Sequence, residues 1–117
     1  MKPKVTDVER LKKQVRQLAA GRVLSGGGAD VYLDLARLDG CQARIAAGYG
    51  SPSKTAQPVP RDRLIWILDG YAEVYDASGR ATSISQGEST VLASGQAYRL
   101  TFPQLSIYLS VEATGNT

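Results

Sequence analysis

The chain has 117 residues, 43% of them hydrophobic and 21% charged, which is typical of one globular domain and excludes a disordered or fibrous protein. No apolar run reaches the roughly 18 to 20 residues of a membrane span, and the N-terminus lacks a secretion signal, so we expect a cytoplasmic protein without a membrane partner. The net charge of +3 is uneven, because residues 1–22 hold seven basic and two acidic side chains. No aromatic side chains are interleaved with these charges, and no helix-turn-helix pair is visible. We therefore expect no nucleic-acid partner.

Residues 6–20 have the pattern of one amphipathic helix. Thr6 and Glu9 have the spacing of a capping box, and Gly21 is placed to end the helix, before a stop signal at residues 25–28. The apolar residues at helical spacing are Val8, Leu11, Val15 and Leu18. Because this stripe is narrow, the helix is expected to dock on the rest of the domain or on a second subunit. We divide the chain into an N-terminal helix, residues 1–22, and a β domain, residues 23–117.

The remainder of the chain consists of short runs of β-forming residues separated by glycine-containing turns at intervals of roughly 8 to 12 residues. The predicted strands are 31–38, 41–47, 64–68, 71–75, 81–84, 89–92, 96–102 and 105–111. Residues 49–61 contain three prolines and predict an extended loop. No helices fit between the strands. The pattern therefore predicts an all-β fold, an antiparallel sandwich or closed barrel, with one N-terminal helix.

The single cysteine, Cys41, has no partner for an intrachain disulfide. The chain has no histidine to activate a thiol, so we interpret Cys41 as a small packing residue rather than a nucleophile.

Two segments of the β region carry a resemblance to a known family. Residues 63–70 (RLIWILDG) are similar to the end of the first motif of the cupins, in which an acidic metal ligand precedes an apolar strand and a turn glycine. Residues 87–98 (GESTVLASGQAY) have the spacing of the second cupin motif, whose last position is a histidine ligand. The resemblance implies an RmlC-like jelly roll, a double-stranded β-helix, around a central pocket.

The same resemblance implies that the metal site of the family is absent. Tyr98 occupies the histidine position of the second motif, Arg63 occupies the glutamate position, and the first-motif histidines would fall near residues 56–59. A guanidinium repels a divalent cation, so we expect no metal and no cofactor. The absence of histidine also excludes a catalytic triad and a histidine general base.

If the barrel is cupin-like, Arg63 and Tyr98 face the pocket together with Ile65 and Leu100. Arg44 and Tyr32 are further candidates for the same cavity, although a register slip of one residue would reverse their faces. An inward arginine indicates recognition of a carboxylate, a phosphate or sugar hydroxyls. The alternative is an Arg63 at the barrel mouth that bonds Asp62 or solvent. The remaining aromatic candidates are interpreted as packing or subunit-interface residues: Trp66, Tyr71 and Tyr75.

Three functions stay open on the sequence. The favoured one is non-catalytic binding of a small polar or anionic molecule, a carboxylate or a sugar. The second is a metal-independent isomerase, epimerase or lyase in which Tyr98 is the acid or base and Arg63 holds an oxyanion. The third is a barrel filled by side chains that acts as an assembly partner through its surface. The apolar strand faces and the helix also predict a symmetric homodimer.

Overall fold

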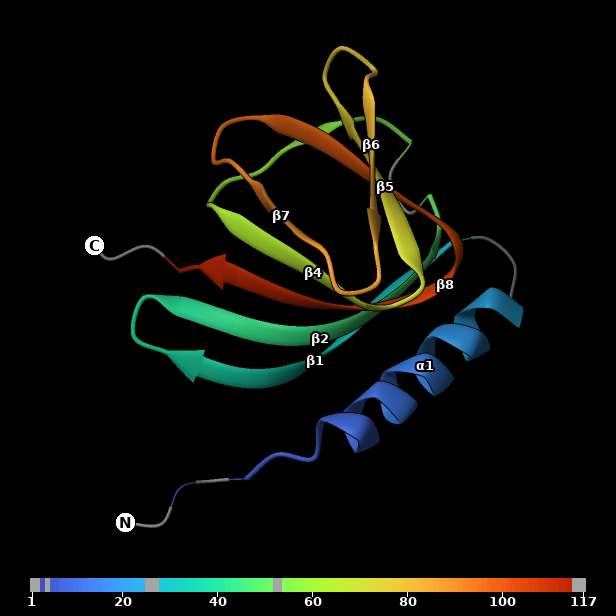
Figure 1. Cartoon of the computed structure of the whole chain (residues 1–117), viewed down its shortest axis with the longest axis vertical. Helices are drawn as coiled ribbons and strands as arrows, with labels where there is room; N and C mark the ends of the chain where they lie inside the picture. Colours follow the sequence, from blue (N-terminus) through green and yellow to red (C-terminus); the bar gives the residue numbers. More distant parts are fainter. Residues whose placement is uncertain (1–2, 4, 25–27, 52–53, 115–117) are drawn as a thin grey trace.

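The computed structural model describes residue 3 and residues 5–24, 28–51 and 54–114. Within them lie one helix and eight strands (Figure 1). In chain order these are α1 (Val8–Leu24), β1 (Ala29–Leu38), β2 (Cys41–Gly50), β3 (Gln57–Pro58), β4 (Arg63–Asp69), β5 (Tyr71–Asp76), β6 (Ala81–Ser85), β7 (Ser89–Leu92) and β8 (Ala97–Ala113).

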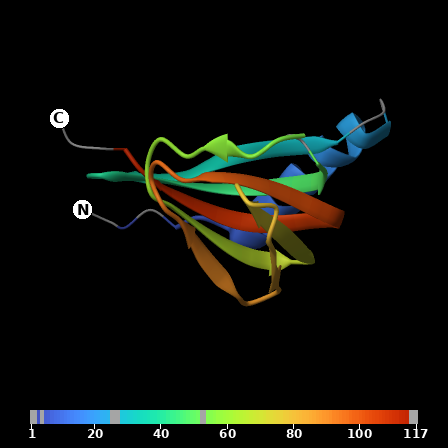
Figure 2. The ribbon, with the colours of Figure 1, turned by 90° about the horizontal axis from the view of Figure 1, so that it is seen from above.

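Antiparallel pairing joins the strands into two sheets that share β8. Sheet A has the order β1, β2, β8, β4, β7, and sheet B contains β3, β5 and β6 with the first part of β8. Figures 1 and 2 show β8 curving round one end of the molecule from one sheet into the other. The predicted all-β architecture with one N-terminal helix is confirmed.

Strand β8 is longer than the sequence pattern predicts. The predicted strands 96–102 and 105–111 are parts of one strand of 17 residues. Pro103, which has no N–H to donate to a ladder, lies between the part of β8 that pairs with β5 and the part that pairs with β4. The proline therefore marks the bend where β8 changes sheets. The predicted loop at residues 49–61 is also interrupted, since β3 pairs there with the start of β8.

The helix begins and ends later than predicted. The Asp7 carboxylate accepts a hydrogen bond from the Arg10 backbone N–H at 3.2 Å, so Asp7 is the N-cap and the Thr6 capping box is wrong. Gly21 lies inside α1 and does not end it, and the helix runs past the predicted domain boundary at residue 22 to Leu24. Most of the predicted stop signal, residues 25–27, lies outside the described residues. No helix in the described part of the chain combines the length and the apolar character of a membrane span.

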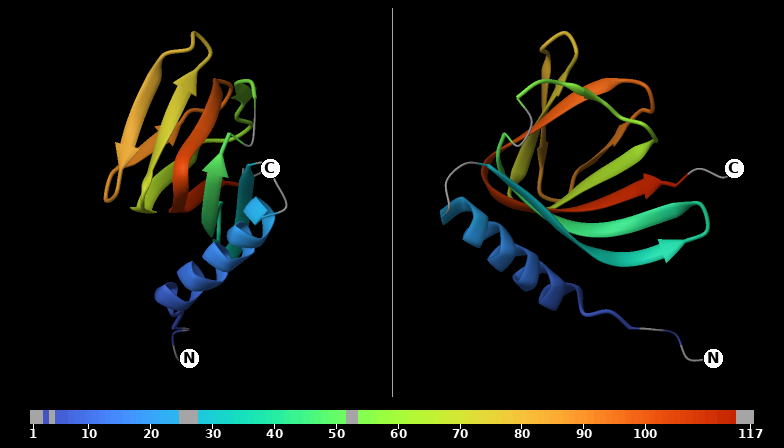
Figure 3. Two further views of the ribbon diagram at one scale, coloured as in Figure 1. Left: turned by 90° about the vertical axis from the view of Figure 1, so that its right-hand side faces the viewer. Right: turned by 180° about the vertical axis from the view of Figure 1, so that it is seen from behind.

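The core has two parts, one on each face of sheet A. Helix α1 packs against β1, β2 and β8 on the outer face, on the side away from β5 and β6 (Figures 1 and 3), and completely buries Val15 and Ala19 there. The predicted stripe is shifted, because Leu18 is 50% exposed. The other cluster lies between the two sheets and includes Ile65, Ile67, Ala72, Phe102 and Tyr108.

Strand β4 shows how alternation assigns residues to these two faces. Ile65 and Ile67 are fully buried in the core between the sheets, and Arg63 precedes them on the same face. Trp66 points to the outer face, where it is 44% exposed. Residues at the start of β4 are therefore directed toward the interior of the barrel.

Candidate functional site

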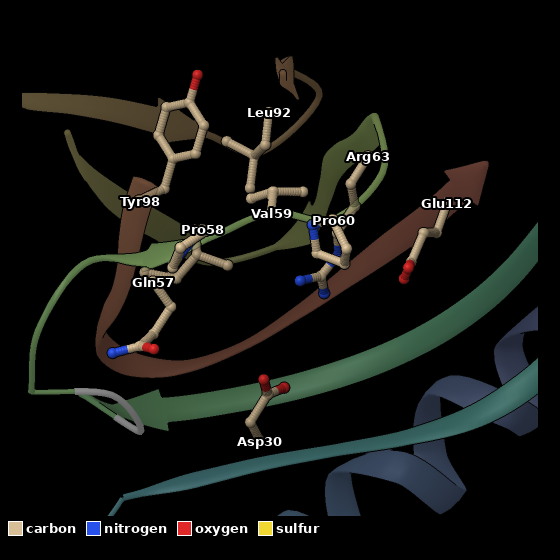
Figure 4. A pocket seen from close by; sticks show the side chains of 10 residues that line it. Asp30, Gln57, Pro58, Val59, Pro60, Arg63, Leu92, Tyr98 and Glu112 are labelled. Atoms are coloured by element: carbon tan, nitrogen blue, oxygen red, sulfur yellow. The ribbon is translucent and has the colours of Figure 1, made fainter. Parts of the chain in front are cut away.

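A cavity with two adjoining lobes lies at one end of the interior, lined by residues of both sheets. The first lobe has a volume of about 220 Å³ and is lined by Asp30, Gln57, Pro58, Val59, Pro60, Arg63, Leu92, Tyr98, Leu100 and Glu112 (Figure 4). The second has a volume of about 200 Å³ and is lined by Asp30, Tyr32, Arg44, Ala46, Arg63, Tyr108, Ser110 and Glu112. Asp30, Arg63 and Glu112 belong to both lobes, so these three charged residues stand at the centre of the cavity.

The guanidinium of Arg63 is anchored on one side only. Its Nε donates to Ser110 Oγ at 2.8 Å, and one terminal nitrogen donates to the Tyr108 hydroxyl at 3.4 Å. Within the described part of the chain Arg63 forms no ion pair within 4.0 Å. Its other N–H groups are therefore available to the cavity, into which Figure 4 shows the guanidinium projecting.

Tyr108 connects Arg63 to a carboxylate. Its ring is buried, lies 5.3 Å from the Phe102 ring centroid in a stacked arrangement, and carries a hydroxyl that donates to Asp30 Oδ1 at 2.7 Å. Burial raises the pKa of the Tyr108 hydroxyl well above its usual range, and the Asp30 carboxylate raises it further. Tyr108 therefore stays protonated. As a permanent hydrogen-bond donor, its hydroxyl orients the Asp30 carboxylate.

Asp30 reaches the cavity from β1 and keeps part of its surface in solvent. Protein atoms nevertheless surround it closely enough that desolvation raises the pKa of its carboxyl above the usual value. The hydrogen bond from Tyr108 and the positive charge of Arg63 oppose this effect. Asp30 is thus a carboxyl group of the cavity whose pKa its surroundings raise.

Glu112 approaches from β8, directly across the ladder from Arg63. Figure 4 shows its carboxylate directed toward the cavity beside the guanidinium. No hydrogen bond or ion pair holds this carboxylate within the described residues. Glu112 is therefore the second acidic group available to a bound molecule.

The opposite wall is mostly apolar. It consists of Pro58 at the end of β3, of Val59 and Pro60 directly after it, and of Leu92 and Leu100. Figure 4 shows the ring of Tyr98 along this wall with its hydroxyl directed away from Arg63 and Asp30. The Tyr98 hydroxyl instead accepts a hydrogen bond from the Ala93 backbone N–H at 3.4 Å. Tyr98 thus presents its ring to the cavity.

Arg44 and Tyr32 line the second lobe as a stacked pair. The Arg44 guanidinium carbon lies 4.3 Å from the centre of the Tyr32 ring, and its Nε donates to Asp34 Oδ1 at 3.2 Å. Because Arg44 already has an ion partner, it is less available to an anionic ligand than Arg63.

Solved structures similar to this chain identify the fold. No protein-family pattern matches the sequence, and no characterised protein matches it. In structure, the chain is similar to a cupin superfamily protein from Desulfitobacterium hafniense, with a TM-score of 0.63, 14% identity and coverage of 74% of this chain and 79% of that one. It is similar to an RmlC-like cupin from Shewanella frigidimarina, with a TM-score of 0.64, 13% identity and coverage of 78% and 81%. The chain has the cupin fold.

A third similar structure, a protein of unknown function from Rhizobium leguminosarum, covers 98% of this chain and 100% of its own, with a TM-score of 0.68 and 11% identity. At these identities the comparisons establish the cupin fold and no ligand or reaction. The resemblance found in the two sequence motifs is therefore confirmed for the architecture.

The residues at the centre of this cupin barrel do not suit a divalent metal. Arg63 supplies a cation in place of a ligand, and the first-motif region contributes Gln57, Pro58 and Val59. No group of three or more histidine, cysteine, aspartate or glutamate side chains gathers anywhere in the described residues. Two carboxylates supply too few ligands for the metals that cupins bind, and the guanidinium beside them repels a metal cation. Metal independence stays a prediction.

The four candidate residues found from sequence all line this cavity, as two pairs. Arg63 and Tyr98 share the first lobe, together with the predicted Leu100, and Arg63 joins Arg44 and Tyr32 at the second. Ile65 lies instead in the core. The roles of Arg63, Tyr98, Arg44 and Tyr32 in binding stay predictions. The alternative bond from Arg63 to Asp62 is absent among the described residues, and the Asp62 carboxylate instead accepts the Ser94 backbone N–H at 2.8 Å. Contact of Arg63 with solvent stays open, because Arg63 is half-buried.

Sequence reasoning missed Asp30, Tyr108, Ser110 and Glu112. All four lie on strands that give no motif. The pairing of β8 with β4 brings Tyr108, Ser110 and Glu112 beside Arg63, and the pairing of β1 with β2 and of β2 with β8 adds Asp30. Core side chains fill part of the interior, and the two lobes leave space at one end of it. Action as an assembly partner through the surface stays a prediction.

Proposed function

We propose that this chain is a non-catalytic binding protein whose cavity holds a small polar molecule through Arg63. The observation that carries the proposal is the anchoring of Arg63 by Ser110 and Tyr108, which leaves its remaining N–H groups without a protein partner in the described residues. A partly buried guanidinium loses hydration, and a carboxylate or hydroxyl oxygen of a ligand restores its hydrogen bonds.

The shape of the cavity supports a small ligand. The two lobes, at about 220 and 200 Å³, together lie near the lower end of the roughly 300 to 1,000 Å³ of pockets for drug-sized molecules. The apolar wall of Pro58, Val59, Leu92 and Leu100 opposes the charged groups and suits a short carbon skeleton. Affinity then comes from few polar contacts and from the exclusion of water.

Native mass spectrometry of untagged protein, purified gently and without chelator, tests this proposal. We expect an additional organic mass on the wild-type chain that is lost on mild collisional activation and is absent from an Arg63→Met variant. Arg99→Met is the matched control, because Arg99 stacks on Tyr75 in sheet B, 4.1 Å from the ring centre, and does not line the cavity. Loss of the extra mass from both variants would refute the role of Arg63.

A second candidate is a metal-independent isomerase, epimerase or lyase. One observation favours it: the Asp30 carboxyl, with its raised pKa, faces the cavity in the manner of a general acid or base. Tyr98, the residue favoured from sequence for this role, has less support because its hydroxyl is directed to Ala93. Turnover by the wild type that is abolished in Asp30→Asn and retained in Tyr98→Phe would establish this candidate and overturn the binding proposal.

A further inference from the structure

The charges at the centre of the cavity restrict the ligand further. Asp30 and Glu112 bring two carboxylates into both lobes, and Arg63 brings one guanidinium. Arg44 adds a positive charge to the second lobe, but Asp34 pairs with it at 3.2 Å. A simple anion would gain contacts with Arg63 and at the same time meet the two carboxylates.

The two carboxylates differ in what they have left to offer. Asp30 uses one oxygen to accept the Tyr108 hydroxyl, while no protein group among the described residues bonds its other oxygen. Glu112 has no hydrogen-bond or ion partner in the same part of the chain, although it lies opposite Arg63 in the ladder. Both therefore present acceptor oxygens to the cavity, and acceptors in a confined site require donors.

We propose that the ligand is a small zwitterion, whose carboxylate bonds Arg63 and whose ammonium group bonds Glu112 and Asp30. This inference rests on the proposed binding function and adds the chemical class of the molecule. A primary ammonium supplies three donors, which match acceptor oxygens approaching from β1 and β8. The Arg63 guanidinium supplies the parallel N–H groups that a carboxylate accepts. A zwitterion places an opposite charge beside each of the three central charged residues, Arg63, Asp30 and Glu112.

Three probes with one carbon skeleton test the inference: 4-aminobutanoate, butanoate and butylamine. Their binding to the uniformly ¹⁵N-labelled chain is followed by the backbone amide signals of Arg63 and Glu112, with probe concentrations up to the millimolar range. We expect 4-aminobutanoate to bind at least about tenfold more tightly than either single-charge analogue, because it forms both ion pairs.

Charge-neutral variants identify the groups that hold the ammonium. Glu112→Gln keeps the size of the side chain and removes its charge, so 4-aminobutanoate should bind about tenfold more weakly while butanoate binds as well or better. Glu9→Gln is the control, because Glu9 loses the same charge from the helix on the outer face of sheet A, where its side chain is 82% exposed. It should change neither affinity.

The outcomes separate the ligand class from the binding function. Butanoate binding as tightly as 4-aminobutanoate in the wild type, or a 4-aminobutanoate affinity unchanged in Glu112→Gln, would overturn the zwitterion and leave a binding cavity for carboxylates. If none of the three probes shifts the cavity signals and native mass spectrometry also finds no retained molecule, the binding function itself is refuted. The comparison of probes on the wild type needs no variant and stands even if Glu112→Gln does not fold.

Discussion

The hydroxyl of Tyr108 provides the sharpest test of how the cavity is built. In a Tyr108→Phe variant the buried ring and its stacking on Phe102 at 5.3 Å are retained, while the donor to Asp30 at 2.7 Å is lost. Hydrogen bonds to charged groups contribute about 1.5 to 3 kcal/mol, so we expect the free energy of unfolding to fall by about 2 kcal/mol. For a domain of this size that corresponds to a decrease in Tm of about 8 °C.

Urea unfolding followed by far-UV circular dichroism, at one fixed protein concentration, measures the difference. The difference between wild type and variant should shrink as the pH falls through the pKa of Asp30, because a neutral carboxyl is a weaker acceptor than a carboxylate. Tyr75→Phe is the matched control, since the Tyr75 hydroxyl also donates to a carboxylate, Glu73, at 2.7 Å, but Tyr75 is partly exposed whereas Tyr108 is buried. It should leave stability unchanged. A Tyr108→Phe variant as stable as Tyr75→Phe would refute the reasoning.

Four further predictions concern the core, the titration of the cavity, the metal and the surface. A Cβ at Gly48 would overlap the buried Phe102 ring, so Gly48→Ala should lower the free energy of unfolding by about 1 to 3 kcal/mol in urea titrations. A Cβ at Gly21, inside α1, would meet nothing within 4 Å, so Gly21→Ala should raise the free energy of unfolding by about 0.5 to 1 kcal/mol. Because folding raises the pKa of Asp30, the folded chain binds more protons than the unfolded chain at pH values between the two pKa values of Asp30, and the free energy of unfolding falls as pH rises through that range. In urea titrations across the acid range, Asp30→Asn should remove this pH dependence. An unchanged slope of stability against pH in Asp30→Asn would contradict the prediction. Elemental analysis of the purified chain should find no stoichiometric transition metal, and a full equivalent would overturn the assignment of Arg63. Trp66 is 44% exposed on the outer face of sheet A, so Trp66→Ser should weaken the predicted homodimer in sedimentation experiments, and a wild-type monomer at micromolar concentration would refute the dimer.

The turns and strands of this fold could be predicted because their signals are local. Glycine-containing turns are predicted between the strands, and Gly70 and Gly79, which lie between predicted strands, both have positive φ, 86° and 85°, which side chains rarely tolerate. The continuity of β8 could not be predicted in the same way. Pro103 reads as a strand breaker, and only the pairing with different strands before and after it shows that the chain continues as one bent strand.

The helix could be predicted from its sequence, but the side chains that it buries could not. Its amphipathic period predicted that it would dock, and it does, but the buried residues are Val15 and Ala19 rather than the full predicted stripe. Ala19 gives a weak hydrophobic signal, while Leu18 gives a strong one and is half exposed. Which side chains a helix buries depends on the sheet beneath it, which is not written in the helix itself.

The site was found in part because Arg63 and Tyr98 stand at spaced motif positions, whereas Asp30 and Glu112 do not. Alternation assigns each of these acidic residues to a face of its strand, but it does not say which faces meet. Asp30 and Tyr108 are 78 residues apart in sequence and share a hydrogen bond. Sequence therefore located the positive charge of the cavity and left out the negative charges on which the proposed ligand preference rests.

The two acidic residues change the ligand that Arg63 is expected to bind. Alone, a guanidinium in a cupin barrel predicts an anionic ligand, because it supplies a permanent cation where the resemblance places a metal-binding glutamate. With Asp30 and Glu112 in the same two lobes, the cavity brings together groups of both charge signs, which β1, β4 and β8 position. If the proposed binding function holds, such a site selects a ligand by the placement of its charges, and a chelator should have no effect on binding. Binding that survives a chelator but is lost in Arg63→Met would follow from this arrangement, whereas binding abolished by the chelator would require a metal that these side chains do not provide for.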